Sequence, residues 1–97
     1  PTGLQDVVIL PKESFTLLVY PNPFRDNATI EYSLPEGGQT RLEIFNLLGS
    51  SLAIPVNQFL SAGNYKTTFP PGDLSSGIYV LRLTNGIHSR TSKLMIR

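Results

Sequence analysis

Hydrophobic residues alternate with polar ones over most of this chain, in short runs separated by Gly, Pro and Asn. The clearest run is 77–85, where large apolar residues stand at every second position: Tyr79, Leu81 and Leu83. A period of two is that of a β-strand with one face against a core. Asn85-Gly86 then predicts a two-residue type I′ turn, because both residues tolerate the positive φ that this turn requires. The chain is therefore predicted to return as an antiparallel strand.

The closing residues of the chain supply that returning strand. Leu94 and Ile96 point to one face, whereas Lys93, Met95 and Arg97 point to the other. Only the first face is apolar enough to complete a core. The end of the chain is thus predicted to be structural, and its loss is predicted to unfold the domain.

The same alternation predicts five earlier strands, at 15–20, 28–34, 41–45, 52–54 and 62–69. The strand 15–20 is largely apolar on both faces, which predicts either a strand covered on two sides or an edge near a partner. Pro55 interrupts the fourth run, so an edge strand is expected there.

Two loops carry further expectations. Pro21-Asn22-Pro23-Phe24 ends the first strand because proline cannot donate a ladder hydrogen bond, and Phe24 is predicted to turn inward as a plug. In the turn 46–49, Gly49 is predicted to be left-handed, with Leu48 packed as a lid.

About seven short strands with regular turn signals and no amphipathic helix indicate an all-β fold, an immunoglobulin-like β-sandwich of antiparallel strands. A small barrel is the competing architecture. At 97 residues the chain holds one domain, predicted to span 15–97. Residues 1–14 are predicted to be a linker or the end of a preceding domain, since 7–10 is an apolar run stopped by Pro11. The opening residues predict a piece cut from a longer protein.

Charge and cysteine content remove several function classes. The formal net charge is +1 and the eight Lys and Arg residues are scattered, so no nucleic-acid site is expected. The absence of cysteine excludes a disulfide framework and thiolate chemistry. No apolar run approaches the roughly 20 residues of a membrane-spanning helix, so no transmembrane segment is predicted.

The candidates for catalysis or metal binding are few. His88 is the only histidine and is predicted to be a solvated residue after the hairpin. Ser75 and Ser76 have no nearby base, which favours a turn. Calcium between turn carboxylates, for example Asp73 with Asp26, stays an alternative to plain solvation. No cofactor is predicted, and an enzyme is the least supported class.

Four tyrosines offer a different kind of surface. Tyr20, Tyr32, Tyr65 and Tyr79 could line a face on which sugars stack, although at strand spacing they are more typical of an amphipathic core.

A series of motifs resembles the C-terminal sorting domain of type IX secretion system cargo proteins. In order, they are Tyr20-Pro21-Asn22-Pro23-Phe24, the strand 30–35, the segment 42–49, Ala62-Gly63-Asn64-Tyr65, the segment 74–79, and Lys93 in the last strand. The resemblance runs from about Tyr20 to Arg97. The related immunoglobulin-like modules of flagellar hook capping type share much of the pattern and stay an alternative.

The resemblance implies a non-enzymatic address label. In that family the domain follows a secreted enzyme or adhesin of Bacteroidetes-type bacteria and is recognised by the outer-membrane secretion machinery. A sortase-like peptidase often removes it and joins the cargo to surface lipopolysaccharide. The cargo is expected to precede the domain covalently and to reach the cell surface or the medium through the periplasm, with any cleavage point within 1–14.

The same resemblance implies which residues carry recognition: Gly77, Tyr79, Lys93, Leu94, Met95, Ile96 and Arg97. The physical counterpart is an exposed terminal strand with unpaired backbone groups, which could add to a partner's sheet while Lys93 and Arg97 make charge contacts. The alternative is that these two charges only keep an edge soluble. A carbohydrate-binding module and a structural spacer are the other function classes left open.

Overall fold

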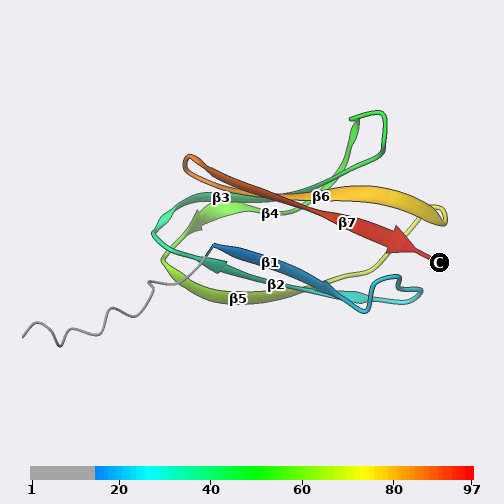
Figure 1. Cartoon of the computed structure of the whole chain (residues 1–97), viewed down its shortest axis with the longest axis horizontal. Coiled ribbons are helices and arrows are strands. Elements are labelled where there is room, and N and C mark those ends of the chain that lie inside the picture. Colours follow the sequence, from blue (N-terminus) through cyan, green and yellow to red (C-terminus); the bar gives the residue numbers. More distant parts are fainter. Residues whose placement is uncertain (1–14) are drawn as a thin grey trace, which may run out of the picture.

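The computed structural model describes residues 15–97, which form seven β-strands and no helix (Figure 1). The strands are β1 (Thr16–Tyr20), β2 (Ala28–Leu34), β3 (Gly38–Phe45), β4 (Ser51–Leu60), β5 (Gly63–Phe69), β6 (Gly77–Asn85) and β7 (His88–Ile96). All paired strands run antiparallel.

The strands form two separate sheets that face each other, so the predicted all-β sandwich is confirmed and the barrel alternative is not formed (Figure 1). One sheet has the order β1-β2-β5 and the other the order β4-β3-β6-β7. In constant-type immunoglobulin domains the fourth strand lies beside the fifth. Here it lies beside the third, which leaves β4 and β7 as the two edges of the larger sheet.

The core lies between the sheets and uses the inward positions that the alternation predicts. Every second residue of β2, from Ala28 to Leu34, is buried, as are Leu81 and Leu83 of β6. Phe24, in the loop after β1, is 1% exposed and fills the core as the predicted plug. Full burial of an aliphatic or aromatic side chain contributes about 1.5–3 kcal/mol, so these positions carry most of the stability.

The turn between β6 and β7 lies one residue later than predicted. Asn85 still pairs with His88, and the two turn residues are Gly86 and Ile87. Gly86 has φ +62°, and no described residue other than glycine has positive φ, which is the pattern of a type II′ turn. Asn85 stays in the strand because its side chain is buried, with its amide donating to the Thr40 hydroxyl at 3.0 Å.

β4 is an edge strand, as predicted, but it continues through Pro55 to Leu60. Leu42 pairs with Val56 and Ile44 with Ala53, so two residues of β4 stand opposite one residue of β3. Such a bulge accommodates a proline without breaking the strand. The predicted strand 52–54 was therefore too short.

The turn between β3 and β4 stands away from the sheet (Figure 1), and Leu48 is not a lid. Leu48 is 92% exposed, so that prediction is wrong. The side-chain oxygen of Asn46 accepts hydrogen bonds from the backbone N–H groups of Leu48 and Ser50, both at 2.9 Å, and Gly49 has the predicted positive φ. The turn is ordered by Asn46, which leaves the apolar tip in solvent.

β1 is an edge of the smaller sheet and not a strand covered on two sides. Val19 is buried, whereas Leu18 on the opposite face is 55% exposed. The apolar run at 7–10 and the predicted linker lie outside the described residues.

Candidate functional site

The loop after β1 is bound to the outer edge of the last strand through one side chain. The amide nitrogen of Asn22 donates to the carbonyl of Lys93 at 2.8 Å, and the N–H of Met95 donates to the amide oxygen of Asn22 at 2.9 Å. One side-chain amide therefore takes the place that a neighbouring strand's backbone would occupy on β7.

Phe24 extends this contact with its own backbone. Its N–H donates to the carbonyl of Met95 at 3.0 Å, and its carbonyl accepts from the N–H of Arg97 at 2.7 Å, which makes a parallel bridge to β7. Its ring meets Phe69 edge-on in the core, with 6.3 Å between ring centroids. We refer to Asn22, Phe24 and their partners on 93–97 as the edge clasp.

The edge clasp takes up some of the outward backbone groups of the terminal strand, which were expected to be unpaired. Along a strand of an antiparallel pair, every second residue points its backbone N–H and C=O groups away from the neighbouring strand. On β7, Lys93 and Met95 point outward to the clasp, and the same parity makes Ser89 and Thr91 point outward. No backbone partner is found for these two on the outer side in the described part of the chain. The free edge is thus the first half of β7.

The segment 75–79 forms a tyrosine corner. The Tyr79 hydroxyl donates to the carbonyl of Ser75 at 2.5 Å. Gly77 between them has φ +155°, a backbone conformation that residues other than glycine rarely adopt. In immunoglobulin-like sandwiches, a tyrosine near the start of the sixth strand makes this kind of hydrogen bond to the backbone upstream. Gly77 and Tyr79 therefore order the entry to β6.

A second corner of the same form begins β5. The Tyr65 hydroxyl donates to the carbonyl of Ser61 at 2.7 Å, and Gly63 has φ +147°. Both corners follow the spacing Ser-x-Gly-x-Tyr, and they lie at opposite ends of the sandwich because β5 and β6 begin at opposite ends (Figure 1). The spacing was visible in the sequence, and its repetition was the signal that sequence reasoning missed.

The proposed recognition residues separate into buried and accessible ones. Tyr79, Leu94 and Ile96 are buried, so their side chains belong to the core. Lys93 and Arg97 are exposed, and Gly77 and Met95 are half-buried. In the folded domain, a partner can therefore touch only the second group and the edges around it.

A groove lies on the outer face of β6 and β7, beside these accessible residues. It has a volume of about 270 Å³ and is lined by Leu47, Ile78, Tyr79, Val80, Thr91, Ser92 and Lys93. Leu47, from the β3–β4 turn, is 67% exposed, and Ile78 is 43% exposed. The groove thus presents apolar side chains to solvent within reach of one lysine.

Two carboxylates on the strands of this domain form ion pairs with cations other than Arg82 and Lys93. Glu43 pairs with Arg41 at 3.3 Å, and Glu31 pairs with Lys66 at 3.5 Å. The Arg82 guanidinium lies over the Phe45 ring, 4.8 Å from its centroid, on the outer face of the larger sheet. Within 15–97, no carboxylate is at ion-pairing distance from Arg82 or from Lys93.

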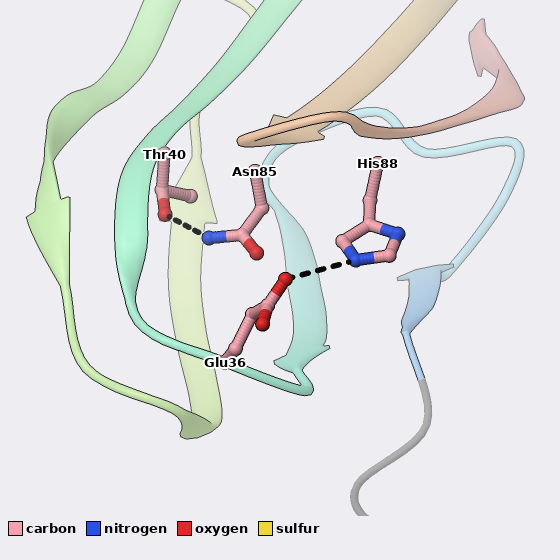
Figure 2. Close-up of polar contacts among 4 residues, drawn as sticks. All are labelled: Glu36, Thr40, Asn85 and His88. Carbon is pink, nitrogen blue, oxygen red and sulfur yellow. Dashed lines mark hydrogen bonds and ion pairs between the residues drawn. The ribbon is translucent and has the colours of Figure 1, made fainter.

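Figure 2 shows a polar cluster near the β6–β7 turn. The Nε2 atom of His88 lies 3.3 Å from a Glu36 carboxylate oxygen, and its ring packs against Phe15 at 5.4 Å between centroids. His88 is therefore half-buried and paired, which corrects the expectation of a solvated residue. Asn85 donates to Thr40, while the Asn85 amide oxygen has no hydrogen-bond partner among the described residues.

The other candidates for chemistry are not brought together. In residues 15–97, no three His, Asp or Glu side chains gather as metal ligands, so the Asp26–Asp73 calcium alternative gains no support. Ser75 and Ser76 are exposed, and Ser75 contributes its carbonyl to the tyrosine corner.

The four tyrosines do not form one face for sugar stacking. Tyr32 and Tyr79 are buried, and the Tyr32 ring stacks on Tyr65 with 5.5 Å between centroids. Burial raises the pKa of Tyr32. The Tyr20 hydroxyl donates to the Glu31 carboxylate, and this exposed hydrogen bond raises the pKa of Tyr20 and lowers that of Glu31.

Replacing Asn22 tests the edge clasp directly. Asn22→Ala removes two hydrogen bonds to β7, and we expect the free energy of unfolding to fall by about 1–3 kcal/mol. Urea denaturation measures the change. The matched control is Asn27→Ala, at an exposed position of the same loop, where a change within about 0.5 kcal/mol is expected. Equal effects of the two substitutions would show that Asn22 is not holding the strand.

Comparison with known proteins adds one finding. A family described as a secretion system C-terminal sorting domain matches residues 18–97. A search of curated proteins gives no match. Among the described residues there is no helix of membrane-spanning length and hydrophobicity.

Proposed function

The chain belongs to the family of secretion system C-terminal sorting domains, and from this premise we propose that residues 15–97 are a non-catalytic address that follows a cargo protein. The family is the sorting signal of type IX secretion, whose proteins are exported to the cell surface or secreted. The cargo is an enzyme or adhesin joined before residue 15, and the reader is the outer-membrane secretion machinery.

The edge clasp is the structural observation that supports this proposal most directly. It joins two of the motifs that carry the family resemblance, 20–24 and the last strand, into one surface. Around it lie the accessible recognition candidates Lys93, Met95 and Arg97. A partner that contacts this surface would read a feature that exists only when the sandwich is complete.

Removal by a sortase-like peptidase is part of the same proposal. β1 begins at Thr16, so a cut within 1–14 would release the cargo and leave all seven strands in the departing domain. The alternatives receive less support, because two of the four tyrosines that a sugar platform would need are buried.

An export assay tests the proposal. A periplasmic reporter is fused to residues 15–97 and expressed in a bacterium with an active type IX system. We expect the reporter at the cell surface or in the medium, and in the periplasm when residues 93–97 are removed. The same fusion in a host without the translocation channel is the control. Export that does not depend on the channel, or retention of the intact fusion, would contradict the proposal.

A further inference from the structure

We propose that the outer face of the β6–β7 hairpin binds an extended acidic polypeptide segment, which pairs with the free half of β7 and places an apolar side chain in the groove beside Leu47. The inference rests on the proposed function, because the segment would belong to a protein of the export machinery. It specifies where that protein binds and what chemistry it presents.

The groove supplies the apolar part of the site. Ile78 and Val80 of β6 and Thr91 and Lys93 of β7 are outer-face residues, and Leu47 stands over them from the β3–β4 turn. A volume of about 270 Å³ is enough for one large side chain with its neighbouring backbone. Solvent exposure of the apolar Leu47 and Ile78 favours occupation by an apolar group.

The free edge of β7 supplies the backbone hydrogen bonds of the site and limits how many residues of the bound segment can pair. Thr91 lines the groove and also belongs to the set whose backbone groups point away from β6. From Lys93 onward, the carbonyl of Lys93 and the backbone of Met95 are taken by the edge clasp. A partner strand can therefore pair only with the stretch around Ser89 and Thr91, as in recognition by strand addition.

Charge selects the composition of the segment. Lys93 lines the groove and Arg82 lies on the same face, and neither has a carboxylate at ion-pairing distance within 15–97. Acidic side chains flanking the apolar one would supply those partners. Complementary charge of this kind also speeds encounter and disfavours wrong partners.

A second copy of this domain is a poorer occupant of the same edge. Residues 88–97 carry Arg90, Lys93 and Arg97 and no Asp or Glu, so two β7 strands paired edge to edge would join two positively charged segments with no carboxylate between them. Such a pair lacks the complementary charge that favours association. An acidic segment supplies that charge.

The test is a selection of random heptapeptides, displayed on phage, against the folded domain. We expect the enriched peptides to alternate aliphatic residues with Asp or Glu. Their dissociation constants are then measured by fluorescence polarisation against two site variants, Leu47→Ser and Lys93→Glu. Each variant is expected to weaken binding by roughly tenfold or more, through loss of the apolar contact and reversal of the charge.

The chain offers a close control for each variant. Leu48→Ser alters the neighbouring exposed leucine, which does not line the groove, and Lys66→Glu makes the same charge change on the opposite sheet. Both are expected to bind as the unaltered domain does. Thr91→Pro removes one outward backbone N–H and is expected to weaken peptide binding about threefold to tenfold. Thr91→Val keeps that N–H and is expected to leave peptide binding unchanged.

Three results would overturn the inference. The selection could enrich basic peptides, or it could enrich peptides no more strongly on the unaltered domain than on the Leu47→Ser domain. The site and control variants could also lose the same amount of peptide affinity. The surface would instead be assigned to membrane binding if the domain bound anionic vesicles and no peptides, and if the Leu48→Ser substitution weakened that vesicle binding. The export assay separates the two proposals. If the unaltered fusion is exported and Leu47→Ser and Lys93→Glu are exported equally well, this inference fails while the sorting function stands. If the unaltered fusion itself is retained, the sorting function fails.

Discussion

Removal of residues 93–97 is expected to unfold the domain instead of merely shortening it. The deletion takes away Leu94 and Ile96, which are 0% and 6% exposed, and with them every partner of the edge clasp. Loss of a large buried aliphatic side chain costs about 2–5 kcal/mol, and two such losses approach the whole stability of a small domain, about 5–15 kcal/mol. Circular dichroism on heating should show no cooperative transition.

A double variant separates this effect from simple loss of surface charge. Lys93→Ser with Arg97→Ser keeps the strand and its buried residues, because both side chains are exposed. We expect it to melt cooperatively, within a few degrees of the unaltered domain. A truncated protein that melts at the unaltered midpoint would show that the last strand is dispensable for the fold.

Phe24→Ala is expected to be the most destabilising single substitution near the candidate site, costing about 3–5 kcal/mol in free energy of unfolding. The Phe24 ring is 1% exposed and packs edge-on against Phe69, so truncation leaves a cavity between the sheets. The backbone hydrogen bonds of Phe24 to β7 lose their anchor at the same time. Urea denaturation measures the loss.

Phe59→Ala is the natural comparison for this substitution. Phe59 is 67% exposed at the β4 edge, and its removal is expected to change stability by about 0.5 kcal/mol or less. A Phe24→Ala domain as stable as Phe59→Ala would mean that the loop after β1 is not part of the core.

The sequence predicted the faces of the strands much better than their connections. Alternation of period two depends only on local pattern, and it correctly placed Ile30, Leu42 and Leu81 inside. The shift of the hairpin turn to Gly86-Ile87 could not be predicted in this way. Asn85 is held in the strand by Thr40, a residue 45 positions away.

The candidate site shows the same division. Phe24 was predicted to turn inward because the two prolines before it end the first strand. Its neighbour Asn22 was treated only as part of a turn, because its partners are more than 70 residues further along the chain. The pairing of His88 with Glu36 was hidden for the same reason, since the two are 52 residues apart. Leu48 was misplaced because an apolar residue in a turn carries no periodicity to show which way it faces.

The separation of Asn22 from Lys93 also bears on how the protein is made. A nascent chain leaves the ribosome with its amino-terminal part first, so the loop after β1 is synthesised long before the residues that it binds. Contacts with so large a sequence separation form slowly, because the intervening chain must be ordered first. The contact can therefore close only after nearly the whole domain has been synthesised, and interrupted translation products would leave the loop without its partner.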